Sequence, residues 1–491
     1  MPEISIAALP EVFVSNSSIS KTVFDALERG ELRKLGSRLY TRNLEAEPET
    51  LIRRNWYFLI PAYYPDAIIA DRTALENKPA SDGSVFLISS KTRDVELPGL
   101  IFRPRKGPEA LEGDKKFIGG ARLSSTARAY LENMAPSRAR SGRLARTLSA
   151  REIEERLDAR LRQQGEDALN RLRDEAHEIA PRLGLEREYE ELNRLIGALL
   201  GTRDAKLASE IAQARAAGQP FDPDRLALFE TLFSALREKV PVPRRAPERT
   251  AEAAATLAFF EAYFSNFIEG TEFSVEEARK IVFEGQIPDG RPQDAHDVMG
   301  TFRVVSDTRE LSRLPRDFDA FVELLRARHA RIMEGRPDKN PGAFKTHENR
   351  AGNTIFVAPD MVLGTLEKGF EFLQALQEPF QRAVFMMFFV SEVHPFADGN
   401  GRVARVMMNA ELVAAGEERI IIPTAYRTDY LGALKAISRN GHTEPVIRML
   451  DRAQDYTHSI DWSTLERART MLDETNAFAE GEEAKLKPPA S

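Results

Sequence analysis

The segment from Pro379 to Val393 restricts the fold more than any other part of the chain. Residues Val384 to Val390 are all apolar, so a helix formed here has no polar face to turn toward water and must lie inside its domain. The apolar pattern ends at His394-Pro395 because proline cannot continue a helix of this kind, and a second helical pattern runs from near Arg402 to Ala415. We therefore predict two helices joined by a loop at the centre of a mainly helical domain.

The joining loop has the composition of a phosphate-binding loop. Gly399 and Gly401 permit a close approach of the backbone, and a glycine-bearing loop that enters a helix directs several unpaired N–H groups at one point. The positive end of the helix dipole lies behind those groups. Arg402 and Arg405 lie one turn apart on the same face, so both can hold phosphoryl oxygens in fork geometry. The sequence therefore predicts a polyphosphate site.

Three other side chains of the loop provide the remaining chemistry. Asp398 is an oxygen ligand suited to Mg²⁺, which takes one or two carboxylates together with phosphates, and Asn400 can orient a phosphate oxygen. His394 has an imidazole that titrates near neutrality and can accept a proton from a hydroxyl that attacks phosphorus. These groups position the reactants and neutralise charge around an in-line displacement, with His394 as the catalytic base. The alternative is a histidine followed by an ordinary glycine-rich turn.

The run from His394 to Arg405 resembles the signature of the Fic family, His-x-Phe-x-Asp/Glu-Gly-Asn-Gly-Arg-x-x-Arg, and agrees with it at every specified position. The resemblance implies a helical domain that transfers AMP from ATP and Mg²⁺ to a Ser, Thr or Tyr hydroxyl of a protein, with pyrophosphate leaving. It also implies that the chain modifies itself.

A helix predicted from Ala251 to Glu269 ends with a glutamate followed by Gly270, and a glutamate at this end of a helix opposes the macrodipole. We therefore expect a cation to face Glu269. Ser265 to Gly270 is similar to the inhibitory pattern Ser/Thr-x-x-x-Glu-Gly/Asn of the Fic family. The resemblance implies that Glu269 pairs with Arg405, removes the arginine that should hold the γ-phosphate, and so inhibits the domain. A solvated glutamate is the alternative.

Two more segments resemble parts of the same family. Residues 340–359 predict a hairpin around a Gly-Asn turn, and its position is similar to the flap that docks the target protein, with Gly352, Asn353 and Thr354 at its tip. A plain connecting hairpin is the alternative. Tyr430 lies in a segment similar to one in which a tyrosine borders the nucleotide. Ser438, eight residues on, stands where relatives often carry asparagine.

The first half of the chain has less distinctive patterns. A short helix that ends at Gly30, followed by a basic hairpin to Arg42, resembles the winged-helix head of abortive-infection-type antitoxins. DNA binding and a purely structural head are both open. Strand-like runs begin at Ser84 and Leu100 in a small α/β unit. Residues 136–151 carry five arginines and no acid, which is typical of a linker or of a phosphate-binding arm.

These patterns predict a mainly α fold class, in which a helical Fic domain with a β-hairpin flap follows an α+β N-terminal region. We divide the chain into a winged-helix-like head (1–55), a small α/β domain (56–135), a helical connector (136–245), the Fic domain with its inhibitory helix (246–462) and a C-terminal tail (463–491). The proline and arginine cluster at 240–247 is the strongest predicted boundary.

Composition limits the surroundings of the protein. The chain has 491 residues, a formal net charge of -7 and no cysteine, which excludes disulfides and thiolate chemistry and favours the cytoplasm. Its longest apolar run is far shorter than the roughly 20 residues that cross a bilayer, so we expect no membrane partner. A homodimer and DNA contact through the head are further partners to test. The rival functions are a DNA-binding regulator that senses nucleotide and an enzyme that removes AMP with the same site.

Overall fold

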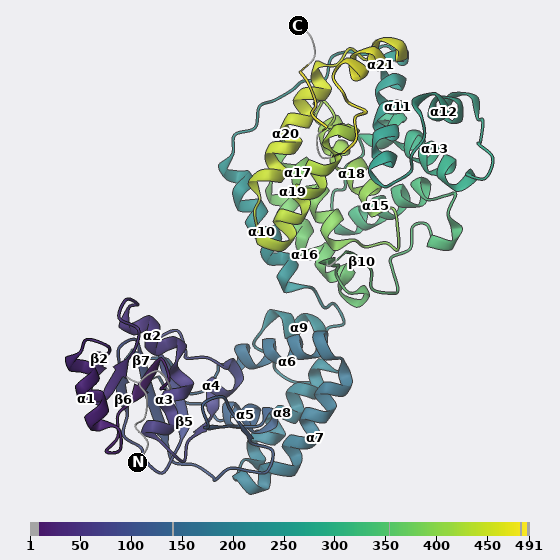
Figure 1. The fold of residues 1–491 in the computed structure, drawn as a ribbon. Helices are drawn as coiled ribbons and strands as arrows, with labels where there is room; N and C mark the ends of the chain where they lie inside the picture. Colours follow the sequence, from purple (N-terminus) through teal and green to yellow (C-terminus); the bar gives the residue numbers. More distant parts are fainter. Residues whose placement is uncertain (1–8, 140–141, 353, 482–483, 489–491) are drawn as a thin grey trace. The chain divides into compact units, whose positions relative to one another are not determined.

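The computed structural model describes residues 9–139, 142–352, 354–481 and 484–488 (Figure 1). The chain divides into two compact units, Met1–Gly218 and Gln219–Ser491. This division lies upstream of the predicted boundary at 240–247. The reason is that helix α10 (Pro223–Glu238) buries Phe229 in the core of the second unit, where its ring meets the ring of Phe389 at 5.4 Å. The finer five-part division stays a prediction.

The first unit begins with the predicted helix and hairpin. Its elements are β1 (Val12–Val14), α1 (Ser20–Glu28), β2 (Arg33–Gly36) and β3 (Leu39–Thr41). The strands form an antiparallel sheet in the order β1-β3-β2. Gly30 follows α1 with a φ of 72°, a left-handed conformation that glycine adopts easily. The likeness of this head to a winged helix stays a prediction.

A second sheet makes up the α/β part of this unit, in the order β6-β7-β5-β4-β9-β8. Strands β5 and β7 run parallel, as do β4 and β9. The predicted strands at Ser84 and Leu100 are β5 and β7. The elements are α2 (Pro48–Arg54), α3 (Trp56–Tyr63), β4 (Ile68–Ile69), α4 (Asp71–Glu76), β5 (Ser84–Ile88), β6 (Val95–Leu97), β7 (Leu100–Arg105), β8 (Lys115–Lys116), β9 (Arg122–Leu123) and α5 (Thr126–Met134).

Helices complete the first unit and share a hydrophobic core with α5. They are α6 (Ala150–Gln164), α7 (Glu166–Leu183), α8 (Glu186–Leu199) and α9 (Glu210–Ala216). The start of α6 is fixed by a capping box, in which the Ser149 side chain accepts from the Glu152 amide and the Glu152 carboxylate accepts from the Ser149 amide. This cap ends the arginine-rich run.

The second unit is helical apart from one short hairpin among its described residues. Its elements are α10, α11 (Ala251–Ile268), α12 (Val275–Arg279), the π-helix η2 (Lys280–Glu284), α13 (Pro292–Ser306), α14 (Thr308–Leu311), α15 (Phe318–Ile332), β10 (Arg350–Ala351), β11 (Thr354–Ile355), α16 (Val362–Ala375), α17 (Pro379–Val393), α18 (Asn400–Ala414), α19 (Arg427–Asn440), α20 (Glu444–Ser459) and α21 (Leu465–Glu474), with short 3₁₀ turns η3 (Pro337–Lys339), η4 (Pro359–Met361) and η5 (Thr424–Tyr426). The segment predicted as a tail contains α21, which buries Ala468 and Leu472.

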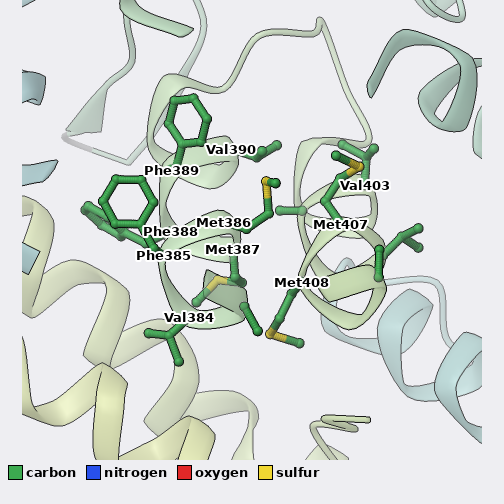
Figure 2. Close-up of a cluster of buried hydrophobic side chains, with 14 of the residues drawn as sticks. Val384, Phe385, Met386, Met387, Phe388, Phe389, Val390, Val403, Met407 and Met408 are labelled. Atoms are coloured by element: carbon green, nitrogen blue, oxygen red, sulfur yellow. The ribbon is translucent and has the colours of Figure 1, made fainter. Parts of the chain in front are cut away.

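Helix α17 is the central helix of this unit, as its sequence predicts. Residues 383–390 have no exposed surface. Figure 2 shows Met386 and Met387 on the side of α17 that faces α18, with Met407 and Met408 across from them, while Phe385 and Phe388 lie on the other side. The loop between α17 and α18 therefore starts and ends on helices that packing holds in place.

Within the part of the chain that the structure describes, no helix combines the length and the apolar character needed to cross a membrane.

Candidate active site

The loop between α17 and α18 begins and ends with residues in the left-handed conformation. His394 caps the C-terminus of α17 with a φ of 52°, and Gly399 precedes the first residue of α18 with a φ of 74°. A Cβ atom at position 399 would lie 2.6 Å from Sδ of Met333, so both the backbone and the available space require glycine there. The structure thus has the arrangement that the sequence predicts, a glycine-bearing loop that enters a helix N-terminus.

The side chain of Asn400 is hydrogen-bonded to the backbone of this loop. Its Oδ1 accepts from the amide of Phe396 at 2.8 Å, and its Nδ2 donates to the carbonyl of Phe396 at 2.9 Å. The side chain is buried. Its amide faces the loop backbone in this structure, whereas the sequence suggested a contact to phosphate. Asp398 accepts from the amide of Gly399 at 2.6 Å.

Two contacts orient the imidazole of His394, one on a face of the ring and one at a ring nitrogen. The ring of Phe356 stacks on it at 3.7 Å with an interplanar angle of 8°. Nδ1 lies 3.2 Å from the carbonyl oxygen of Ser391, which can only accept, so Nδ1 carries the proton and Nε2 has a free lone pair. Burial lowers the pKa of His394 to about 4. His394 is therefore neutral at pH 7 and able to accept a proton at Nε2.

A second histidine, His329 of α15, supports the loop from behind and was not identified from the sequence. Its ring stacks on Phe396 at 3.6 Å with an interplanar angle of 3°. The amide of Gly342 donates to Nδ1 at 2.9 Å, so the proton lies on Nε2, which donates to the carbonyl of Asp398 at 2.9 Å. Burial lowers the pKa of His329 to about 4. A neutral imidazole thus connects α15, the segment before the flap and the loop.

Arg405 and Glu269 form the ion pair that the sequence suggests. Nη2 of Arg405 lies 2.7 Å from Oε1 of Glu269, and the same guanidinium donates to the carbonyl and the hydroxyl of Ser265. Burial alone would lower the pKa of Arg405, but the carboxylate of Glu269 and the hydroxyl of Tyr430 raise it overall. The Glu269 carboxylate lies against Gly401, since a Cβ atom there would collide with Oε1. It therefore covers the first turn of α18.

The other signature arginine, Arg402, pairs with a carboxylate that no sequence pattern indicated. Its Nη1 lies 2.7 Å from Oδ2 of Asp297 on α13, and Arg336 contacts the same oxygen at 2.7 Å. Asp297 and Arg402 are both buried. Nη2 of Arg402 is 3.8 Å from Asp398. In this structure Arg402 is held by protein carboxylates.

The hairpin of residues 340–359 is present and attached to the loop. β10 and β11 pair antiparallel, with Ala351 opposite Thr354, and Gly352 has a φ of 57°. Gly352 is exposed and Thr354 is half-buried, while Asn353 lies outside the described residues. Phe356, just after β11, is the residue that stacks on His394.

A buried lysine ahead of β10 also contacts the loop between α17 and α18. The amide of Lys345 donates to the carbonyl of Pro395, and its Nζ donates to Asn349, which in turn donates to the carbonyl of Phe396. Burial lowers the pKa of Lys345 to about 8. The base of the flap is thus bonded to two adjacent carbonyl groups at the start of the loop.

Tyr430 lies beside Arg405, and its place next to the nucleotide stays a prediction. Its ring centroid is 5.9 Å from the Arg405 guanidinium, and the side chain is buried. Ser438 faces a different group, because its hydroxyl donates to Glu392 at 2.5 Å. Glu392 also pairs with Arg225 of α10 at 3.1 Å.

Among the described residues, no group of three or more His, Cys, Asp or Glu side chains could hold a metal ion by itself. Asp398 is the loop carboxylate, and its side chain is 42% exposed. A single accessible carboxylate fits the way Mg²⁺ binds together with substrate phosphates.

A glycine loop at a helix N-terminus, two arginines in the first turns of that helix and a neutral histidine thus come together in one helical domain. Residues 318–412 match the model of the Fic/DOC family. The chain therefore contains a Fic domain. The match runs from α15 through most of α18, so the helix that carries Glu269 lies outside it.

Curated proteins with similar sequences are named adenylyltransferases. The protein adenylyltransferase fic-1 of Caenorhabditis briggsae is 25% identical over 195 residues, which are 39% of this chain and 38% of that protein. The protein adenylyltransferase Fic of Drosophila willistoni is 25% identical over 283 residues, 55% of each. This chain thus spans about two fifths to just over half of these relatives. A solved Fic domain containing signaling protein from Bacteroides thetaiotaomicron aligns at 16% identity over 50% of this chain and 98% of its own, with a TM-score of 0.38.

Proposed function

We propose that this protein transfers an adenylyl group from ATP to a hydroxyl of a Ser, Thr or Tyr side chain in a target protein. The observation that carries the proposal is the state of His394, a neutral imidazole with a free Nε2 lone pair at the edge of the glycine loop. A group in this state can accept a proton at neutral pH without first losing one.

In the proposed reaction, the target hydroxyl oxygen attacks the α-phosphorus while its proton passes to Nε2 of His394. The bond from that phosphorus to the oxygen of the β-phosphate breaks, and pyrophosphate leaves. The N–H groups at the start of α18, with Arg402 and Arg405 once they are available, stabilise the charge on the phosphoryl oxygens. Asp398 would hold Mg²⁺, which neutralises phosphate charge when it is bound. Asn400 would keep the loop in shape.

The proposal includes inhibition by Glu269. Its carboxylate occupies Arg405 and covers Gly401, which are two of the places where phosphate oxygens would bind. Ser265 supports the inhibited state because it accepts two hydrogen bonds from the same guanidinium. ATP would then bind with its α-phosphate away from His394. The flap residues Gly352, Asn353 and Thr354 would pair with an extended segment of the target. Self-modification would place a hydroxyl of the same chain, or of a second copy in a homodimer, in that position.

Removal of AMP by the same site is a second candidate. The observation in its favour is that the Glu269 side chain is 33% exposed beside the loop, where a carboxylate can orient water. In that case Glu269→Gly would abolish the release of AMP from a modified protein instead of raising transfer.

DNA binding by the head has less support. Arg29 pairs with Glu31, Arg33 donates to the carbonyl of Leu44, and Arg38 donates to the carbonyl of Ser15. Of these contacts, only that of Arg29 with Glu31 neutralises a positive charge, and the bonds to carbonyl groups leave Arg33 and Arg38 with further donors. A gel shift with duplex DNA, at several salt concentrations, tests this function separately from transfer.

The deciding experiment incubates the Glu269→Gly protein with labelled ATP, Mg²⁺ and a cell lysate, and then follows label transferred to protein. Glu269→Gly combined with His394→Ala is the control. Label on one or more protein bands that requires His394 supports the proposal, whereas equal label with and without His394 would exclude it.

A further inference from the structure

The arginine-rich run of the first unit lines a cleft that the proposed reaction does not use. The cleft has a volume of about 810 Å³. Among the residues that the structure describes, five arginines from two distant segments border it, namely Arg103 and Arg105 of β7 and Arg138, Arg143 and Arg146 of the run. Residues 103 and 105 are two apart on one strand, so their side chains point to the same side of the sheet. The fold therefore gathers basic residues that are separate in sequence.

A buried carboxylate fixes two of these arginines in position. Asp71 has no exposed surface and adopts a left-handed conformation with a φ of 53°. Its two oxygens accept from Arg105 at 2.8 and 2.9 Å and from Arg146 at 2.6 Å. Asp71 thus pairs with two arginines, and Arg105 also lies 3.5 Å from the buried carboxylate of Glu132. The two arginine side chains remain 26% and 29% exposed, so they present fixed positive charge to the cleft.

Arg103 is held in a different way. Its Nη1 donates to the carbonyl of Leu144 at 3.0 Å, and its guanidinium lies over the ring of Phe86, 5.0 Å from the centroid. A guanidinium has five N–H donors, so this contact leaves donors for a ligand. Arg138 is exposed at the border of the same cleft. Little side-chain freedom would be lost when an anion binds to donors that are already held in place.

We propose that this cleft binds a small ligand that carries several adjacent phosphate groups. Guanidinium forks match phosphate oxygens in geometry and charge, and the volume falls within the range of small-molecule sites. Two carboxylates, Asp94 and Glu96, also line the cleft, and Glu96 pairs with Arg143 at 2.9 Å. These carboxylates would repel a continuous polyanion such as nucleic acid that crosses the cleft.

The test is calorimetric titration of the full chain with inorganic tripolyphosphate, in an Arg405→Ala background that weakens the loop of the second unit. The variants are Arg103→Gln and Arg138→Gln. Arg151→Gln is the matched control, because Arg151 belongs to the same run but pairs with Glu155 and does not border the cleft. We expect one bound tripolyphosphate, an affinity about tenfold weaker for each of the two variants, and no change for the control.

Absence of binding in the Arg405→Ala background overturns the proposal, and so does equal binding by all the variants. Duplex DNA is titrated in parallel. DNA that binds more tightly than tripolyphosphate, and that responds to the same two substitutions, would make the cleft a nucleic-acid site and also overturn the proposal. Thermal unfolding checks that each variant folds. If Arg103→Gln does not fold, the exposed Arg138 decides the outcome.

Discussion

Oε1 of Glu269 and Nη2 of Arg405 lie 2.7 Å apart, although 136 residues separate them in the chain. Glu269 caps the C-terminus of α11, where a carboxylate is unfavourable by about 0.3 to 1 kcal/mol unless a cation is nearby. Arg405 is that cation. The pair stabilises the end of α11, and by the same contact it occupies the arginine that we propose as a phosphate ligand.

We expect Glu269→Gly to raise adenylyl transfer by about tenfold or more, because losing a contact worth about 1.4 kcal/mol in the inhibited state changes a rate or population tenfold. The measurement is label from ATP on protein per unit time. Glu272→Gly is the control, since Glu272 is an exposed glutamate three residues further along. Similar labelling by wild type, Glu269→Gly and Glu272→Gly would remove the inhibitory role.

Arg405→Ala, made in the Glu269→Gly protein, should reduce transfer by about tenfold to a hundredfold. The released guanidinium is then lost as a phosphate ligand, and a charge-assisted pair of this kind contributes roughly 1.5 to 3 kcal/mol. Arg448→Ala is the control, because Arg448 is an exposed arginine on α20. Competition with unlabelled ATP shows whether the loss lies in nucleotide binding. Undiminished transfer by Arg405→Ala would mean that Arg405 serves only to hold Glu269.

Much of this site could be predicted from sequence because its chemistry lies in local patterns. The apolar run of α17, its end at His394 and the helix that starts beyond Gly399 are consequences of residues within about one helix length of each other. The pairing of Glu269 with Arg405 is long-range. It was accessible only because a glutamate at a helix C-terminus requires a cation and because the motif resembles a known one.

The remaining contacts could not be predicted because both partners look ordinary in sequence. His329 contacts a carbonyl 69 residues away, and Asp297 contacts Arg402 across 105 positions on another helix. A histidine or aspartate on an amphipathic helix usually lies at the protein surface or in the core. Tertiary packing alone decides which loop its side chain contacts. Phe356 is similar, since nothing in a hairpin sequence indicates that one of its aromatic rings stacks on the imidazole of His394.

The two buried histidines should make the free energy of unfolding depend on pH. Burial lowers the pKa values of His329 and His394 to about 4, below the value of about 6.5 expected in the unfolded chain. Between pH 6.5 and 4 the unfolded state therefore binds more protons than the folded state. The contribution of these two histidines to the free energy of unfolding is complete above pH 6.5, and it is lost as the pH drops toward 4. Each histidine contributes a slope of up to about 1.4 kcal/mol per pH unit.

His329→Gln should flatten this slope by the share of one histidine, as measured by denaturant unfolding at several pH values between 7 and 4. It should also lower the rate of transfer more than nucleotide binding, because the imidazole ring that stacks on Phe396 of the loop is lost. His347→Gln is the control, since His347 is exposed near the flap. An unchanged slope in His329→Gln would contradict the neutral, buried state of this imidazole.

Asp297→Asn tests whether Arg402 depends on its carboxylate. Asp297 is buried between Arg402 and Arg336, and neutralising one member of a buried ion pair leaves the other charge uncompensated. We expect the free energy of unfolding to fall by about 2 to 4 kcal/mol, together with weaker ATP binding as Arg402 loses its orientation. Asp294→Asn is the matched control, because Asp294 pairs with the same Arg336 but is 30% exposed, and it should cost no more than about 1 kcal/mol. Equal losses in the two variants would show that Asp297 supports Arg336 alone and has no part in placing Arg402.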